Sequence, residues 1–312
     1  MERRQLANGV DVSRLILGCG NFGGIGSAPE FFGRGDTDEQ AFELMDAAWD
    51  FGITTFDTAD AYGGGRSETA IGKWIAARGY RPEIATKTFN PMSASADHGL
   101  ARARVTRQLE SSLDRLGVNH VDVYLAHAFD PDTPLEETIS TFDAVQQLGL
   151  IRTWGVSNFD EQQLRSLLEL ARPAVVQNAY SLLERADEAV VLPLCREFDI
   201  SYTPFGPLSG GLLAGKYGAD APPPPESRLA LRPEPYEHLL TPETFARLQR
   251  FAEAARQRGV ASSTLAIAWL LAQPGVTAVI IGPRRVEHLE AAVAALELRL
   301  SAAEADALTQ LF

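Results

Sequence analysis

Four side chains that can hold or move a proton follow apolar segments with the composition of strands. Asp57 ends the β-branched segment 53–57, and Tyr62 follows five residues later. Lys87 ends segment 83–87, and His127 ends segment 121–127. Parallel α/β folds keep their chemistry at the C-terminal ends of strands, so we expect these four side chains to meet at one rim.

Together these groups suit proton donation to a carbonyl that receives a hydride. A phenol, with an unperturbed pKa of about 10, is a poor acid near neutral pH unless a nearby cation favours the phenolate. Lys87 can supply that cation, and Asp57 can keep the ammonium charged and oriented. His127 can hydrogen-bond a substrate oxygen. Taken singly, each residue also has a structural interpretation, so the hypothesis depends on all four converging.

The elements that must position these groups alternate between strand and helix patterns. Asn8-Gly9 is a strong turn signal and predicts a hairpin over residues 4–13. Strands are expected at Leu15 and over residues 53–57, 83–87, 121–127, 151–157, 174–177, 200–205 and 277–281. Helices are expected over residues 38–51 (capped by Thr37 or Asp36), 67–78, 97–116, 135–148, 160–171, 187–198, 242–258, 262–271, 286–296 and 301–311.

Eight strand-helix units are the number that closes a (β/α)₈ barrel. We therefore predict an α/β fold, a (β/α)₈ TIM barrel with an N-terminal β-hairpin and extra helices, although an open doubly wound sheet is an alternative. Because no domain boundary is visible in 312 residues, a single barrel domain is expected over residues 1–312. Residues 218–240 are rich in proline, which predicts a long loop without regular structure, either a lid or a solvated surface loop.

Composition argues against several classes of partner. The net charge of -13 disfavours a nucleic-acid surface. The N-terminus lacks the apolar core of a signal peptide and no apolar run is long enough for a bilayer, so we expect a cytoplasmic protein without a membrane partner. Cys19 and Cys195 lie far apart and are expected as buried, reduced thiols. The five histidines show no ligand pairing, so no metal is expected.

A glycine motif after the first strand has two interpretations. Gly18, Gly20 and Gly23 match G-x-G-x-x-G, the fingerprint of a Rossmann dinucleotide site. That site requires a helix to open at the third glycine. Residues 24–35 hold further glycines and a proline and cannot form the first turns of a helix. We therefore predict a strand that runs into a lid-like loop.

Five spaced motifs resemble the aldo-keto reductase family. They are D-T-A-x-x-Y-G over residues 57–63, the lysine of ATKT, the strand-end His127, GVSNF over 155–159 and VQNAYS over 176–181. The match runs over nearly the whole chain, and the motifs agree in order. The chain stops soon after its last expected helix, at Phe312, which resembles the branch without the long C-terminal substrate loop of aldose reductases.

The resemblance implies an oxidoreductase that uses NADPH, with NADH as a second possibility, to reduce aldehyde or ketone carbonyls to alcohols. It implies Tyr62 as general acid, Lys87 and Asp57 as the pair that tunes it, and His127 as the group that orients the carbonyl. Ser157, Asn158 and Gln177 would bind the nicotinamide carboxamide, and Phe205 would stack on its ring. The other implied cofactor residues are Gly20, Asn21, Phe22, Asp57, Gly206, Pro207, Leu208, Ser209, Gly211, Lys216, Gly282, Pro283, Arg284 and His288.

Departures from the family pattern concern the cofactor's adenosine end and the substrate. His288 and Ala292 replace the family's usual residues, which leaves the choice between NADPH and NADH open although Arg284 and Arg285 can bind a 2′-phosphate. The pocket walls are expected from residues 24–36, 128–134 and 218–240. Phe22, Phe31, Phe32 and Phe129 favour an apolar carbonyl, and the expected substrate contacts are Phe22, Tyr62, His127 and Phe129.

Two other functions remain open. A strand-end lysine such as Lys87 could form a Schiff base, which would make the protein a barrel lyase. The fold and cofactor could also serve a regulatory subunit of a channel with little turnover. For the reductase, we expect a small-molecule carbonyl substrate and a monomer or small homo-oligomer.

Overall fold

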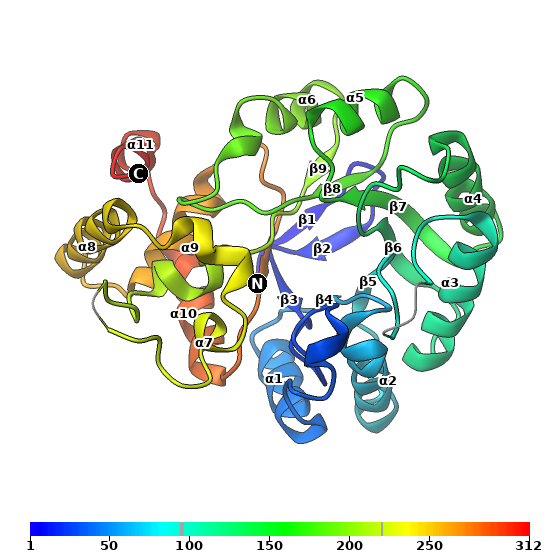
Figure 1. Cartoon of the computed structure of the whole chain (residues 1–312), viewed down its shortest axis with the longest axis horizontal. Coiled ribbons are helices and arrows are strands. Elements are labelled where there is room, and N and C mark those ends of the chain that lie inside the picture. The colour runs from blue at the N-terminus through cyan, green and yellow to red at the C-terminus, as the bar shows by residue number, and fades with distance from the viewer. Residues whose placement is uncertain (94–96, 220) are drawn as a thin grey trace.

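The structure is a computed structural model that describes residues 1–93, 97–219 and 221–312. Within these residues, eight parallel strands curl into a barrel in the order β10-β3-β4-β5-β6-β7-β8-β9, and helices surround it (Figure 1). Backbone hydrogen bonds from Thr277 N to Tyr202 O (2.8 Å) and from Ile280 N to Pro204 O (2.9 Å) join the two ends of the sheet. The predicted (β/α)₈ barrel is confirmed. Its strands are β3 (Leu15–Gly18), β4 (Thr55–Asp57), β5 (Glu83–Thr88), β6 (Val121–Ala126), β7 (Ile151–Ser157), β8 (Val175–Gln177), β9 (Ser201–Tyr202) and β10 (Val279–Ile281).

The helices bury their apolar faces against the outside of the barrel. Thr37 begins α1 with a capping box to Gln40, which satisfies backbone donors at its N-terminus. No helix in the described part of the chain is long and apolar enough to cross a membrane. The α-helices are α1 (Asp38–Asp50), α2 (Arg66–Arg78), α3 (Arg102–Leu116), α4 (Leu135–Gln147), α5 (Glu161–Leu168), α6 (Val191–Glu197), α7 (Arg228–Leu231), α8 (Pro242–Gln257), α9 (Ser262–Ala272), α10 (Val286–Glu297) and α11 (Ala302–Thr309). Short 3₁₀ turns are η1 (Pro29–Phe31), η2 (Tyr62–Gly64), η3 (Ala186–Glu188), η4 (Ser209–Ala214) and η5 (Glu234–Leu239).

The N-terminal hairpin closes one end of the barrel. Strands β1 (Arg3–Gln5) and β2 (Asp11–Ser13) pair antiparallel, as the Asn8-Gly9 turn predicts. The buried hairpin residues Leu6 and Val10 share a hydrophobic cluster with Leu125 and Ile280, which belong to the barrel strands. This end is therefore filled with side chains.

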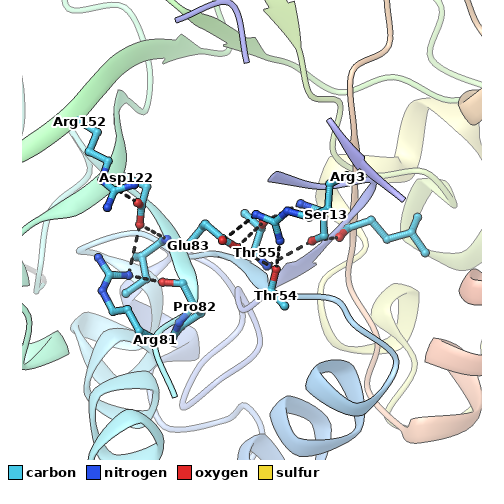
Figure 2. Close-up of polar contacts among 11 residues, drawn as sticks. Arg3, Ser13, Thr54, Thr55, Arg81, Pro82, Glu83, Asp122 and Arg152 are labelled. Atoms are coloured by element: carbon cyan, nitrogen blue, oxygen red, sulfur yellow. Dashed lines mark hydrogen bonds and ion pairs between the residues drawn. The ribbon is translucent and has the colours of Figure 1, made fainter. Parts of the chain in front are cut away.

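A polar network at the same end ties the strand starts together (Figure 2). Arg3 donates to Glu83 at 2.7 Å, and the buried Asp122 lies 3.2 Å from Arg81 and 3.3 Å from Arg152. A cleft of about 390 Å³ lies here between the hairpin and Arg3, Glu83 and Arg152. Because both of its arginines are paired with carboxylates, we assign this end a structural role. The candidate catalytic groups lie at the opposite ends of the strands.

Helix α3 begins at Arg102, so the predicted start at residue 97 is wrong. Gly99 has a φ of 101°, a left-handed conformation that only glycine adopts easily. The next amide, Leu100 N, donates to Asp130 Oδ2 at 2.6 Å instead of entering a helix. Glycine and a side-chain acceptor from another loop therefore delay the helix.

The predicted continuous helix over 187–198 is also wrong, because the segment divides into η3 and α6. Pro193 has no amide hydrogen and its ring would collide with the carbonyl four residues earlier. It is tolerated only in the first turn of α6, so the helix restarts at Val191. The predicted strand 200–205 shortens to β9 for a related reason, since Pro204 cannot donate to a neighbouring strand.

Regular structure occurs within residues 218–240, against the prediction for this proline-rich stretch. Ser227 caps α7 by accepting from Ala230 N, and η5 begins after Pro233. The prolines stand before α7, at the N-cap of η5 or in its first turn, where a missing amide hydrogen costs little. Residue 220 of the predicted loop lies outside the described residues.

Candidate active site

A buried ion pair is the centre of the candidate site. Lys87, near the end of β5, places its Nζ 2.5 Å from Oδ1 of Asp57, the last residue of β4, and donates to the carbonyl of Thr58 at 2.8 Å. Burial disfavours the ammonium, but the charge of Asp57 and the oxygen of Tyr62 outweigh it and raise the pKa of Lys87. Lys87 is therefore a fixed cation, which disfavours the Schiff-base interpretation because a protonated amine is not nucleophilic.

Tyr62 begins η2, in the turn after β4, and its ring lies beside the ion pair. The Nζ of Lys87 lies 5.1 Å from the centroid of the ring. Burial raises the pKa of Tyr62, while the charge of Lys87 acts in the opposite direction. The charge of Lys87 lowers the pKa of Tyr62 as predicted, but the opposing effect of burial is larger. Gly20 lies against the Tyr62 ring, and a Cβ there would make an ordinary contact with it at 3.5 Å.

His127 follows β6 and meets Tyr62 edge to face, with ring centroids 5.5 Å apart. Burial and the nearby charge of Lys87 lower the pKa of His127 to about 3. The imidazole is therefore neutral near pH 7 and can donate one hydrogen bond. All four predicted catalytic side chains meet at the C-terminal rim, which is the arrangement expected from their strand-end positions.

Three predicted carboxamide-binding residues lie next to this group. Gln177, at the end of β8, donates from Nε2 to Asp57 Oδ2 at 2.9 Å. Asn158 donates to the carbonyl of His127 at 2.9 Å and to Ser157 Oγ at 3.1 Å. Its φ of 58° is left-handed, which asparagine tolerates better than most residues. The ends of β7 and β8 therefore present amide and hydroxyl groups beside the ion pair.

The segment after β9 forms a glycine-rich turn. Phe205 packs against the hydrophobic cluster inside the barrel. Gly206, Gly210 and Gly211 have φ values of 70°, 68° and 95°. A Cβ on Gly211 would lie 2.7 Å from Cε of Lys216, so glycine leaves room for the lysine to fold back over the turn. The other predicted residues of this segment, Pro207, Leu208 and Ser209, lie in or just before η4, where Ser209 Oγ lies 2.7 Å from Ser181 Oγ.

Basic side chains gather between this turn and the loop after β10. Burial and the positive charges of Arg285, Lys216 and Arg284 lower the pKa of His288. His288 Nδ1 accepts from Arg284 N at 3.2 Å. Arg284 follows the exposed Gly282 and the buried Pro283 in the same loop. The positive charges around His288 form an environment in which an anionic phosphate would be stabilised.

Arg284 also ties neighbouring loops together. It donates to Glu226 O at 2.5 Å and lies 3.7 Å from Asp36 Oδ1, while Arg228 donates to Asn21 Oδ1 at 2.7 Å. Burial raises the pKa of Asp36, and its Oδ2 is buried without a hydrogen-bond partner. The loops after β3 and β9 thus meet at the edge of the basic cluster.

The loop after β3 is not the start of a Rossmann helix, as predicted. Residues 21–36 fold back on themselves, and the next α-helix is α1. A Cβ on Gly24 would lie 2.5 Å from Gly63 Cα, so the loop packs directly on the turn that carries Tyr62. Phe22 is 1% exposed and belongs to the core. Phe129 is half-buried and meets Phe159 edge to face at 5.6 Å.

Several polar residues around the site have no sequence motif that reveals them. Asn90 lies 3.1 Å from the ring of His127 through its Nδ2. Arg104, buried on α3, donates to Thr88 Oγ1 at 2.9 Å and to Asn90 O at 2.7 Å. Asp60 is fully buried and accepts from Thr88 Oγ1 at 2.7 Å. The described residues contain no group of three or more His, Cys, Asp or Glu side chains that could hold a metal ion.

The fold is a (β/α)₈ barrel, and titratable side chains gather at the C-terminal ends of its strands. The chain belongs to the aldo/keto reductase family, whose model matches residues 14–312. This confirms the resemblance found in the sequence motifs.

Individual relatives agree with the family. The chain is 37% identical over 316 residues to the uncharacterized oxidoreductase YrpG of Bacillus subtilis (strain 168), covering 94% of this chain and 90% of the relative. It is 33% identical to the probable voltage-gated potassium channel subunit beta of Oryza sativa subsp. japonica, covering 83% of each. The structure of glycerol dehydrogenase AKR11B4 from Gluconobacter oxydans matches with a TM-score of 0.84 and 26% identity over 99% of this chain and 94% of that one. The chain is thus an oxidoreductase of this family.

Proposed function

We propose that this protein reduces aldehyde or ketone carbonyls to alcohols with NADPH, on a single barrel domain over residues 1–312. The observation that carries the proposal is the position of Tyr62 beside the buried Asp57–Lys87 pair. A phenol placed beside a fixed cation can give its proton to an oxygen that is gaining charge, and the cation then stabilises the phenolate.

Each of the four side chains has a separate role in the proposed proton transfer. Tyr62 keeps its proton in the resting protein because burial raises its pKa. It donates that proton to the substrate oxygen, and the ammonium of Lys87 stabilises the phenolate that remains. Asp57 keeps Lys87 charged, and neutral His127 donates a hydrogen bond that orients the carbonyl. The reduced nicotinamide, when bound, supplies the hydride.

The residues that would hold the nicotinamide cofactor suit its chemistry. Ser157, Asn158 and Gln177 offer polar groups for the carboxamide next to the ion pair. Phe205 would stack on the nicotinamide ring, and the glycine-rich turn with Lys216 would wrap the diphosphate. The basic side chains of Lys216, Arg284 and Arg285 support NADPH over NADH, because a 2′-phosphate adds negative charge beside the positive charges that lower the pKa of His288.

For the substrate we propose an apolar aldehyde or ketone. Phe129 is half-buried, follows His127 by two residues and packs on Phe159. Residues 24–36, 128–134 and 218–240 would form the walls of the pocket. A preference for charged sugar phosphates over apolar carbonyls would contradict this assignment.

The test is titration with NADPH and NADH followed by fluorescence, then addition of 4-nitrobenzaldehyde with absorbance recorded at the reduced-nicotinamide band. Tyr62→Phe is expected to bind NADPH like the wild type but to lose turnover about 10²-fold or more, the usual contribution of a general acid. Tyr80→Phe is the control, because Tyr80 is 39% exposed and stacks on Trp49. Absence of nucleotide binding to the wild type would overturn the proposal.

A second candidate is a cofactor-binding regulatory subunit with little turnover. The similarity to the probable channel subunit beta of Oryza sativa subsp. japonica favours it. The two candidates differ in one observable result. Tight NADPH binding without multiple turnovers of any simple aldehyde would favour the regulatory function, whereas repeated turnover would favour the reductase.

A further inference from the structure

The amide of Asn90 touches the candidate site although no motif identifies it. Asn90 stands two residues after β5, and its Nδ2 lies 3.1 Å from Nδ1 of His127. An amide nitrogen can only donate, so Nδ1 must accept. A neutral imidazole carries one ring proton, and that proton then belongs to Nε2.

The ring of His127 carries only one proton, so only one of its two nitrogens can donate a hydrogen bond. Burial and the charge of Lys87 lower its pKa to about 3, so the ring stays neutral over the ordinary working range of an enzyme. A neutral ring donates from one nitrogen alone. The choice of nitrogen therefore decides whether His127 can donate a hydrogen bond to a substrate at all.

Asn90 is held in place by its surroundings. The buried guanidinium of Arg104 donates to Asn90 O at 2.7 Å and also to Thr88 Oγ1 at 2.9 Å and Gly99 O at 3.0 Å. One rigid cation thus fixes the backbone on both sides of the loop that carries the amide. A second contact of the same amide, from Nδ2 to Ser27 Oγ, is longer at 3.4 Å.

We infer that Asn90 is a positioning residue that fixes His127 in the tautomer protonated on Nε2, so that His127 can donate to the substrate oxygen. The inference rests on the proposed function for the role of that donor. Its structural part, the tautomer, stands on the contact between Asn90 and His127 alone.

The tautomer can be measured directly by ¹⁵N NMR of protein labelled at histidine. The five histidines are distinguished by the signal that disappears in His127→Gln. The wild type is expected to show a protonated Nε2 and an unprotonated Nδ1 at His127. The opposite pattern would overturn the inference, and this measurement requires no variant of Asn90 to fold.

Two substitutions then test the cause. Asn90→Leu removes the donor, and the tautomers are expected to mix. Asn90→Asp offers only acceptors, and the proton is expected on Nδ1. Both are expected to lower kcat for carbonyl reduction about tenfold, the size of one lost hydrogen bond, while the Kd for NADPH stays unchanged. Asn119→Leu is the control, because Asn119 is an exposed asparagine just before the start of β6, at the opposite end of the strand from His127. It is expected to match the wild type in tautomer and rate.

The outcomes separate the inference from the proposed function. A wild type with Nε2 protonated that reduces no carbonyl would contradict the proposed function and support the assigned tautomer. A wild type that reduces carbonyls, with Asn90→Leu unchanged in both tautomer and kcat, would contradict only the role of Asn90.

Discussion

The ammonium of Lys87 lies 2.5 Å from the carboxylate of Asp57, and the two side chains are 1% and 5% exposed. Removing one partner leaves the other charge buried and unpaired, which costs about 3–5 kcal/mol. Lys87→Met and Asp57→Asn are each expected to lower the free energy of unfolding by that amount. The double substitution is expected to lose much less than the sum while remaining inactive, as measured by urea denaturation and NADPH oxidation.

The pair between Lys73 and Asp38 is a matched control. Its atoms lie 2.6 Å apart, but the side chains are 56% and 51% exposed. Such a pair contributes about 1 kcal/mol or less, so Lys73→Met should change stability little. Equal losses in Lys73→Met and Lys87→Met, or strict additivity in the buried pair, would show that burial does not determine the cost.

Asp60 is expected to make stability depend on pH. Burial and the nearby carboxylate of Glu68 raise its pKa to about 7, from an ordinary value of 3.8. The folded protein therefore keeps a proton that the unfolded chain releases, so the free energy of unfolding falls as pH rises between these two values. This contribution amounts to about 4 kcal/mol at most.

Asp60→Asn removes the titrating group and keeps an oxygen that can accept from Thr88. Urea denaturation over about pH 5 to 8 should show a flatter profile for the variant than for the wild type. The variant should also be the more stable protein at the alkaline end. Parallel profiles for the two proteins would mean that Asp60 does not carry this proton.

Arg284 is expected to discriminate between the two nicotinamide cofactors. Because a guanidinium binds a phosphate with two hydrogen bonds, Arg284→Gln should raise the Kd for NADPH about tenfold or more and change the Kd for NADH little. Fluorescence titration measures both constants. Arg165→Gln, on the exposed side of α5, is the control. An equal change for both cofactors would contradict a 2′-phosphate contact at this residue.

The sequence predicts the barrel well because its signals are local and repeated. Alternating strand and helix patterns, together with Asn8-Gly9, define the hairpin and the eight strands. The errors occur where one residue overrides a local pattern. Gly99 and Asp130 delay α3, and Pro193 divides the helix expected over residues 187–198.

The candidate site shows the same limit. Strand-end positions predict that Asp57, Lys87 and His127 converge, because the strands of a parallel barrel all end at one rim. Asn90 and Arg104 come from a loop and a helix, and only tertiary packing brings them to His127. The net rise in the pKa of Tyr62 is likewise a property of burial, which residue spacing does not reveal.

The most direct test of the account follows the hydride itself. The wild type is given NADPH deuterated at both C4 positions together with 4-nitrobenzaldehyde, and the product alcohol is examined by mass spectrometry. The account predicts one deuterium on the carbinol carbon and loss of the product in Tyr62→Phe. Alcohol without deuterium, or NADPH bound but never consumed with any aldehyde, would contradict hydride transfer at this rim.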